Sequence, residues 1–451
     1  MVRALHTSDW HLGSQLYEKD RLEEQKQFLA WLTKTIAEEK IGVLAVAGDI
    51  FDNHAPSVAA QTLYFEFLAG LLELGQARPE IFIIAGNHDS PQFLSAPREI
   101  LSHLRIHIVS AAEPRRPEGE VFAIRDAKGN PLLAVCAVPF LRERDLRLVS
   151  DLGSGDDPAA AYREAAAGHF RAAVDLARRS MPELPVLVMG HLFLGGAALS
   201  DDASERLREV GRLSSMPAEM LPPADYYALG HLHRPQYIHD MEHCRYSGSP
   251  IAMSFSEAEQ TKSVTIVEFE SASHQHDLFR GGGPRITCRE VPGFSRLEQI
   301  RGTAETIRKR LEEIKAAETG RRGQAASTEL TATTGQETAL PPSALLTPPL
   351  FIEIQLTGSS GDVQDFWAEI DSLRSEALEN RYSFSILAKQ DLRDTGAAAA
   401  AADFTEIRAL KPVDVFERKL DEEHIEGEKR NTFLAMFREA AEQVEAGNHE
   451  D

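Results

Sequence analysis

Short apolar runs alternate with longer amphipathic stretches over residues 2–280. This alternation is typical of strands and helices that stack as layers in an α/β domain. Between the first two runs, Phe28, Leu32 and Ile36 recur at helical spacing, with Leu29 beside them, which predicts a helix packed on a sheet. A second helix is expected over residues 58–74. Its apolar side chains suit either the core or a dimer contact, and we favour the core.

Five of the apolar runs end in clusters of polar residues. The clusters are SDWH after residues 4–5, GDIFD after 43–47, GNHD after 81–85, GH after 186–189 and GHLH after 226–229. In an open α/β sheet, groups at the carboxyl ends of strands converge on one crevice even when they are far apart in sequence. The clusters are therefore expected to meet in one functional site.

The side chains of these clusters are carboxylates, amides and imidazoles, with no thiolate. They are Asp9, His11, Asp49, Asn87, His88, His191, His231 and His233. Oxygen and nitrogen ligands of this kind suit Mn, Fe or Zn. Residues i and i+2 of an extended segment point the same way, so Asp9 and His11 are able to face one ion together. Any one of these residues is more often a helix cap or a hydrogen-bonded core histidine, but the whole set indicates a metal site.

The segment GGGP at 281–284 is expected to be a hinge that ends a first domain at residues 1–280. We expect residues 284–395 to form a smaller α+β domain. Its predicted elements are a charged helix at 297–314, a strand at 350–358, a helix at 366–378 and a strand at 381–389. A Thr-, Gly- and Pro-rich stretch at 319–349 is predicted to be a flexible insertion.

The last part of the chain is predicted to be a linker followed by two short helices. Residues 396–403 read GAAAAAAD, a linker, although six alanines could equally continue a helix. Residues 404–451 contain two amphipathic helices that are too short to bury their apolar stripes alone. They either fold back on the preceding domain or dock on a partner, and the linker favours docking.

Composition limits the class of protein. A chain of 451 residues with 43% hydrophobic and 26% charged residues has room for two or three globular domains. There is no apolar signal segment at the N-terminus and no run of 18 uncharged apolar residues, so we expect a cytoplasmic protein with no membrane association. The three scattered cysteines argue against a disulfide framework and against a structural zinc site.

The net charge of −22 would by itself disfavour binding to nucleic acid. However, residues 414–451 contain 12 acidic and 5 basic residues, so part of the excess lies in a tail that need not face a substrate. Bound divalent metals would also add local positive charge. The total charge therefore does not exclude a nucleic-acid substrate.

The order DxH, GDxxD, GNHD, GH and GHxH is similar to the signature of the calcineurin-like metallophosphoesterase superfamily. Longer blocks over about the first 280 residues also resemble the SbcD family, the nuclease subunits of bacterial SbcCD complexes. These blocks are SDWHLGS (8–14), AGDIFDNHAPS (47–57), AGNHDSP (85–91), GHLHRPQ (230–236) and YSGSPIAMSF (246–255). The resemblance implies a four-layer α/β/β/α sandwich with a smaller α+β capping domain and a C-terminal helical pair.

The resemblance also implies a site that holds two divalent metal ions. Mn²⁺ is expected, with Mg²⁺, Fe²⁺ and Zn²⁺ as alternatives. One ion would be held by Asp9, His11, Asp49 and His233, and the other by Asp49, Asn87, His191 and His231. Asp49 would bridge the two ions, and His88 would be the catalytic histidine beside them. Asp52 stands where related nucleases often have a histidine near the substrate, and it either takes over that catalytic role or supports the loop.

The function implied is ATP-dependent 3′–5′ exonuclease activity on double-stranded DNA, and endonuclease activity on single strands and hairpins, in DNA repair, recombination and replication. The implied partner is an SbcC-type SMC-like ATPase, gripped by the C-terminal helices. A homodimer within a heterotetramer would form through the helices near residues 63–74. An alternative is a metallophosphodiesterase acting on a small phosphodiester or a phosphoprotein. A catalytically silent binding scaffold is a third possibility, which the complete set of ligands argues against.

Overall fold

The structure is a computed structural model. It describes residues 1–113, 116–146, 157–197, 215–238, 241–270, 283–332, 348–357, 363–379 and 384–391, and the single positions 430, 434 and 437. The expected linker at 396–403 lies outside the described residues. The two C-terminal helices expected within 404–451 also lie outside them, apart from those three positions.

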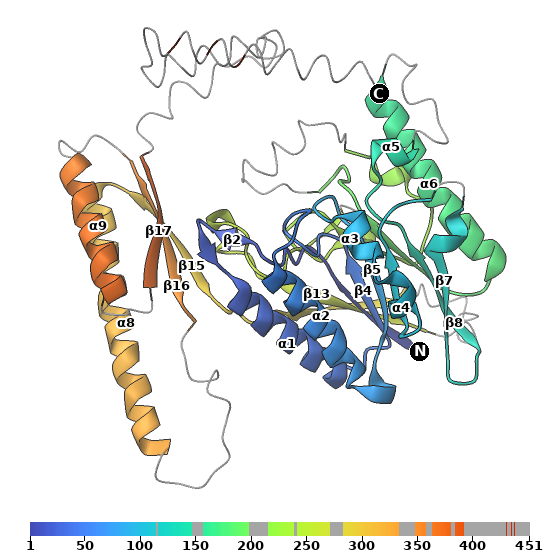
Figure 1. The fold of residues 1–451 in the computed structure, drawn as a ribbon, viewed down its shortest axis with the longest axis horizontal. Coiled ribbons are helices and arrows are strands. Elements are labelled where there is room, and N and C mark those ends of the chain that lie inside the picture. Colours follow the sequence, from blue (N-terminus) through green and yellow to red (C-terminus); the bar gives the residue numbers. More distant parts are fainter. Residues whose placement is uncertain are drawn as a thin grey trace.

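Two six-stranded sheets form the centre of the larger domain (Figure 1). The first sheet has the order β14-β13-β1-β4-β5-β6 and the second has the order β11-β12-β10-β9-β8-β7. The strands of the first sheet are β1 (Val2–Thr7), β4 (Val43–Ala47), β5 (Glu80–Ile84), β6 (Ile106–Val109), β13 (Ser263–Phe269) and β14 (Arg285–Glu290). Those of the second are β7 (Val121–Arg125), β8 (Pro131–Ala137), β9 (Val186–His191), β10 (Tyr226–Gly230), β11 (Gln236–Ile238) and β12 (Met241–Tyr246).

Helices cover the outer face of each sheet. Helices α1 (Leu22–Glu38) and α2 (Val58–Leu72) pack on the first sheet, and α6 (Pro158–Ser180) packs on the second. The side chains of β4 alternate between two cores, with Val43 and Ala45 between the sheets and Leu44 and Val46 under the helices. The domain is therefore the expected four-layer α/β/β/α sandwich.

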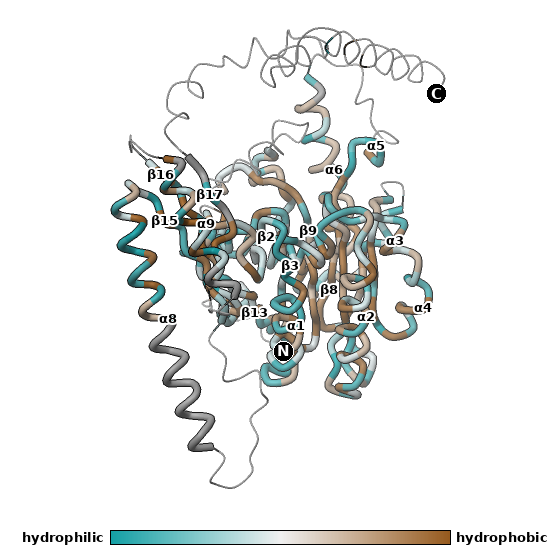
Figure 2. The backbone as a smooth tube through the Cα atoms, turned by 60° about the vertical axis from the view of Figure 1, so that its left-hand side comes forward, coloured by the Kyte–Doolittle hydropathy of each residue, from teal (hydrophilic) through white to brown (hydrophobic). Residues whose placement is uncertain are grey.

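Shorter elements connect these layers. They are β2 (Gln15–Leu16), β3 (Lys19–Asp20), α3 (Pro91–Ser95), α4 (Arg98–Ser102), α5 (Glu143–Leu146), η1 (Gly75–Ala77), η2 (Pro117–Glu120), η3 (Ala218–Met220) and η4 (Phe255–Glu257). Figure 2 shows hydrophobic residues concentrated along the central strands. Among the described residues, none of the helices is both long enough and apolar enough to cross a membrane.

The two helices expected in the first part of the chain are present. Phe28, Leu32 and Ile36 of α1 face the core, as their spacing predicts. Helix α2 also buries most of its apolar residues in the core, but Val58 (78% exposed) and Phe65 (39% exposed) lie on its outer face. The preferred core interpretation of α2 is thus confirmed for most of the helix.

The second domain differs from the expected α+β arrangement. Its elements are β15 (Arg296–Gly302), α8 (Ala304–Ala332), β16 (Leu350–Leu356), α9 (Val363–Glu379) and β17 (Phe384–Asp391). The three strands are parallel, in the order β15-β16-β17, and both helices pack on one face of the sheet (Figure 1). This is a βαβαβ unit, because each helix connects one parallel strand to the next.

Three boundaries also differ from the expected ones. Residues 297–302 belong to a strand and not to a helix, because they pair with β16. Helix α8 continues to Ala332, into the stretch expected to be a flexible insertion. Strand β14 pairs with β13 and completes the first sheet, so the first domain extends beyond residue 280, to at least Glu290.

Candidate metal centre

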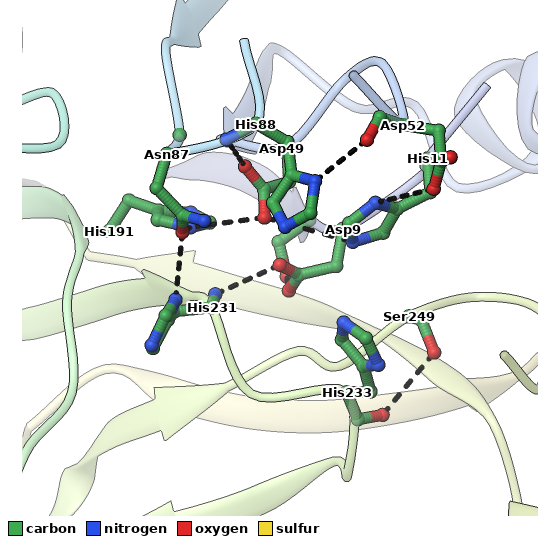
Figure 3. Close-up of polar contacts among 12 residues, drawn as sticks. Asp9, His11, Asp49, Asp52, Asn87, His88, His191, His231, His233 and Ser249 are labelled. Carbon is green, nitrogen blue, oxygen red and sulfur yellow. Dashed lines mark hydrogen bonds and ion pairs between the residues drawn. The ribbon is translucent and has the colours of Figure 1, made fainter. Parts of the chain in front are cut away.

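The polar clusters meet where strands of both sheets end (Figure 3). Strands β1, β4 and β5 are mutually parallel in the first sheet, and β9 and β10 are parallel in the second. The loops after β1 and β10 are joined because the backbone N–H of His231 donates to Asp9 Oδ1 at 2.9 Å. The ends of β4 and β9 are joined because His191 Nδ1 lies 2.9 Å from the carbonyl oxygen of Ala47. Ligands from both sheets therefore face one site.

The backbone adopts uncommon conformations where these ligands lie. Asp9, His11 and Asp49 have φ values of 52°, 44° and 50°, in the left-handed region that non-glycine residues rarely occupy. Backbone hydrogen bonds from Asp9 N to Gly48 O and from His11 N to Asp49 O, both 3.0 Å long, hold this arrangement. Such conformations cost about 1 kcal/mol or more each, and they concentrate at functional sites.

Two glycines permit the close approach of the loops. A Cβ atom on Gly86 would lie 2.1 Å from Asp49 Oδ1, and one on Gly230 would lie 1.9 Å from the carbonyl oxygen of Ala47. Both separations are far below van der Waals contact, so a side chain at either position would force the ligand loops apart.

One group of candidate ligands consists of Asp9, His11 and His233. Their ligand atoms lie within 4.8 Å of one another, and all three residues are buried. Neither ring nitrogen of the buried His11 makes a hydrogen bond within the described structure. An imidazole buried without hydrogen bonds is costly, and a cation beside it would satisfy its nitrogen lone pair. The group therefore fits a metal site.

A second group consists of Asp9, Asp49 and His191, with ligand atoms again within 4.8 Å of one another. Asn87 Oδ1 lies 3.1 Å from His191 Nε2 and 3.0 Å from His231 Nδ1, so the amide and His231 extend this group. The donor set consists of carboxylate, amide and imidazole groups, which suits a divalent transition metal.

Asp9 belongs to both groups. Asp49, a member of the second group, also lies close to the first. Its Oδ2 atom is 3.4 Å from His191 Nε2 and 3.7 Å from His11 Nε2. Burial alone would raise the pKa of Asp49, but the neighbouring His191 and His11 outweigh it and hold that pKa well below its usual range. Asp49 is therefore a buried carboxylate anion that faces both groups.

The contact with Asp49 also changes the pKa of His191. Burial would lower the pKa of His191, but Asp49 and Asp9 raise it to about 9. Burial also raises the pKa of Asp9. Because a metal ligand must be a deprotonated nitrogen, metal binding here has to displace a proton.

His88 belongs to neither group of ligands. Its backbone N–H donates to Asp49 Oδ1 at 2.8 Å, and its ring Nδ1 donates to the carbonyl oxygen of Asp52 at 2.7 Å. A carbonyl oxygen can only accept, so Nδ1 carries the proton in the neutral ring. The ring is partly exposed and stands beside that of His11, with ring centroids 4.9 Å apart.

Asp52 lies at the edge of the site. Its Oδ1 atom is 3.5 Å from His11 Nδ1, and its side chain is 37% exposed. The stronger contact is made by its backbone carbonyl, which orients His88. Asp52 thus contacts two residues of the site, one through its side chain and one through its backbone.

The sequence reasoning gave no role to Asp89, although Asp89 closes the GNHD cluster. This fully buried carboxylate accepts hydrogen bonds from the backbone N–H groups of Ile50 (3.2 Å), Phe51 (3.0 Å) and Gly86 (2.8 Å). It thereby ties the loop after β4 to the loop after β5. Burial, and then the nearby Asp49, raise the pKa of Asp89 to about 6.

The sequence reasoning also missed Glu257. Its Oε1 atom lies 3.3 Å from His233 Nδ1. Glu257 follows His233 by 24 residues and belongs to none of the strand-end clusters, so no spacing in the sequence points to this contact.

Comparison with known proteins agrees with this geometry. Residues 2–235, which include every candidate ligand described above, match the calcineurin-like phosphoesterase family. The SbcD protein of the SbcCD nuclease from Bacillus subtilis (strain 168) is 37% identical over 300 residues, which are 65% of this chain and 74% of that protein. This chain belongs to the calcineurin-like phosphoesterase family, in its SbcD group.

Two further SbcD relatives match over similar lengths. The protein from Escherichia coli (strain K12) is 39% identical over 275 residues, which are 60% of this chain and 66% of the relative. The one from Rhodobacter capsulatus is 36% identical over 293 residues, 63% of this chain and 68% of the relative. These alignments span about two thirds of each relative and about 60% of this chain.

Proposed function

We propose that this chain is the nuclease subunit of an SbcCD-type complex and hydrolyses phosphodiester bonds in DNA. The observation that carries the proposal is the convergence of buried carboxylate and imidazole groups from four strand ends, with both nitrogens of His11 left without hydrogen bonds. The similarity to SbcD nuclease subunits supports the choice of DNA among phosphodiester substrates.

The proposed metal ligands fall into two sets that share Asp49. Asp9, His11, Asp49 and His233 would hold one divalent ion, and Asp49, Asn87, His191 and His231 would hold the other. When bound, such a pair of ions lowers the pKa of a water molecule and neutralises charge on the phosphate. We propose Mn²⁺ as the native ion. Because the donor set suits several divalent metals, Mg²⁺, Fe²⁺ and Zn²⁺ are the alternatives.

His88 is the proposed catalytic residue. Its Nδ1–H is held by the carbonyl of Asp52, which directs Nε2 away from that carbonyl, so Nε2 is the nitrogen that would transfer a proton. In its protonated form His88 would stabilise the charge that develops on the phosphate and protonate the leaving 3′-oxygen. Asp52 would support this role by orienting His88, which favours the loop-supporting interpretation of Asp52 over a direct catalytic one.

We further propose that the activity is ATP-dependent 3′–5′ exonuclease cleavage of double strands and endonuclease cleavage of single strands and hairpins. It would serve DNA repair, recombination and replication in the cytoplasm. The partner would be an SbcC-type SMC-like ATPase. Val58 and Phe65, exposed on the outer face of α2, support a homodimer contact through this helix within a heterotetramer.

The proposal is tested by digestion of end-labelled duplex and hairpin DNA with Mn²⁺, with and without an SbcC-type ATPase and ATP. The expected result is cleavage of both DNAs, with ATP-dependent shortening of the duplex in the presence of the ATPase. A generic aryl phosphodiester is the comparison substrate. Cleavage of the aryl phosphodiester without cleavage of either DNA would instead favour a small-molecule phosphodiesterase. No hydrolysis of any substrate by the metal-loaded protein would favour a binding scaffold.

A further inference from the structure

We propose that Glu257 is a positioning residue for His233, and that the short helix η4, which carries Glu257, links the metal site to the second domain. This inference rests on the metal site of the proposed function. It concerns residues beyond 235, where the match to the phosphoesterase family ends.

The contact between Glu257 and His233 determines how the imidazole is presented. Glu257 is 1% exposed, and its Oε1 atom lies 3.3 Å from His233 Nδ1. With Nδ1 turned toward this carboxylate, Nε2 is the nitrogen that remains for the group formed with Asp9 and His11. A carboxylate behind a metal-binding histidine fixes the ring orientation and makes the ring a stronger ligand.

Lys262 holds Glu257 in this position. Its Nζ atom lies 2.5 Å from Glu257 Oε2, and it also donates to the carbonyl oxygen of His233 at 3.0 Å and to Ser249 Oγ at 3.1 Å. Lys262 is only 7% exposed, so its charge is compensated mainly by Glu257. Lys262 therefore links the Glu257 carboxylate to the backbone of His233, the histidine that Glu257 orients.

The loop after β12 closes around the same histidine. The backbone N–H of Ser249 donates to the carbonyl oxygen of His233 at 3.1 Å, and its side-chain Oγ donates to the same oxygen at 3.5 Å, the contact drawn in Figure 3. A Cβ atom on the neighbouring Gly248 would lie 2.6 Å from that oxygen. This close packing explains the glycine of the YSGSP segment, which supplies none of the proposed ligands.

The other face of η4 contacts the second domain. Phe255, two residues before Glu257, is 4% exposed and packs in a cluster with Leu16 and with Phe351 of β16. Phe351 lies on the face of the small sheet opposite to α8 and α9, because its neighbours Leu350 and Ile352 pack under the helices. This single turn of helix therefore contacts the proposed metal ligand His233 on one side, through Glu257, and the second domain on the other, through Phe255.

A cavity of about 400 Å³ lies at this junction. Glu257 and Lys262 line it from the first domain, and Ser295, Arg296 and Leu297 line it from the start of the second domain. The ion pair of Glu257 and Lys262 thus borders the connection between the two domains. A change in the position of the second domain would therefore act directly on this ion pair.

The test measures Mn²⁺ binding to the purified full chain by calorimetry after removal of metal with a chelator. The wild-type chain is expected to bind two ions. Glu257→Gln keeps the size of the side chain but removes its charge, and we expect one of the two sites to bind about 10–100-fold more weakly while the other is unchanged. Glu259→Gln, an exposed residue of the same loop, is the matched control and should bind as the wild type does.

Equal binding of both ions by Glu257→Gln would overturn the positioning role. Failure of the wild-type chain to bind metal would instead overturn the proposed function, so the two failures are distinguishable. If Glu257→Gln does not fold, Glu257→Asp takes its place. Aspartate keeps the charge beside Lys262 but is shorter by one methylene group, and unchanged binding in that variant would equally overturn the role.

The link to the second domain is tested with Phe351→Ala, which alters no residue of the first domain. We expect weaker Mn²⁺ binding at the same single site that Glu257→Gln weakens. Trp367→Ala, on α9 at the opposite face of the small sheet, is the control and should leave both sites unchanged. Wild-type binding by Phe351→Ala would overturn the link and leave the role of Glu257 standing.

Discussion

Carboxylate and histidine side chains meet at both ends of the first sheet, with different results. At the amino ends of the strands, Glu80 accepts hydrogen bonds from His107 at 2.9 Å and from Arg105 at 2.7 Å. At the carboxyl ends, Asp49 lies 3.7 Å from His11 Nε2, which is too long for a hydrogen bond, although both groups are almost fully buried. The residue types are alike, but in the second set both ring nitrogens of His11 lack hydrogen bonds within the described structure.

This difference separates an ion-pair cluster from a candidate metal centre. The partly exposed Glu80 cluster obtains its hydrogen bonds from its own members. The buried cluster around His11 has left-handed backbone at three ligands and histidine nitrogens without hydrogen bonds. Proteins tolerate such costs where a ligand or reaction requires them. Unsatisfied buried nitrogens therefore indicate a metal site better than the number of histidines does.

The largest effect is expected from Asp49→Ala. Asp49 faces both groups of ligands, so its removal should abolish the binding of both ions and reduce DNA cleavage to the metal-free background. Calorimetric titration with Mn²⁺ measures the first effect, and digestion of labelled DNA measures the second. Glu80→Ala, at the opposite end of the sheet, is the control. Retention of two tightly bound ions by Asp49→Ala would contradict the bridging position.

A smaller loss of activity is expected from His88→Ala. Because His88 stands beside the ligands, the variant should bind two Mn²⁺ ions as the wild type does, yet cleave DNA about 10²–10⁴-fold more slowly. His54→Ala, an exposed histidine a few residues after Asp49, should cleave DNA at the wild-type rate. Loss of one bound ion in His88→Ala would assign His88 to the ligands instead.

The side chains that meet at the candidate site could be picked out from the sequence because each one lies close to the end of an apolar run. Strand β4 and Asp49, for example, are recognisable within seven residues of the chain. Parallel strands then bring the separate loops together without any further information. The local pattern was therefore sufficient for the meeting of these side chains and for the layered fold of the first domain.

Elements that depend on distant partners were predicted poorly. Strand β15 is half-exposed and rich in Arg, Glu and Gln, a composition that also suits a solvated helix, and its partner strand begins at Leu350. Strand β14 pairs with β13 across the GGGP segment that was interpreted as a domain boundary. Asp89 and Glu257 contact residues of other loops, so their roles follow from the tertiary structure and not from spacing.

A moderate loss of stability is expected from Asp89→Asn. The carboxylate accepts three backbone N–H groups, whereas an amide has one accepting oxygen and would turn its own N–H₂ toward a donor. Leaving a buried donor unsatisfied costs about 1–3 kcal/mol in the free energy of unfolding. Urea unfolding of the chelated protein measures this cost. Wild-type stability of Asp89→Asn would show that the two loops do not depend on this carboxylate.

The smallest effect is expected at the amino ends of the strands, from Glu80→Gln. Although burial opposes it, hydrogen bonds from His107 and Arg105 lower the pKa of Glu80. A depressed carboxyl pKa stabilises the fold above the unfolded value, near 4.5, and this contribution is lost as pH falls through the lower folded value. Because Arg105 is half-exposed, solvent screening limits the contribution to about 0.2–1 kcal/mol.

Urea unfolding of the wild type and of Glu80→Gln at a series of pH values measures this contribution. The wild type should be more stable at pH 7, and the difference should shrink as pH falls below 4.5 and through the lowered pKa of Glu80, where Glu80 becomes protonated. Such a loss with pH, together with unchanged Mn²⁺ binding in Glu80→Gln, would fit an ordinary ion pair. Weakened Mn²⁺ binding in Glu80→Gln would contradict the distinction between an ion-pair cluster at one end of the sheet and a metal centre at the other. It would mean that the two ends of the sheet are not independent.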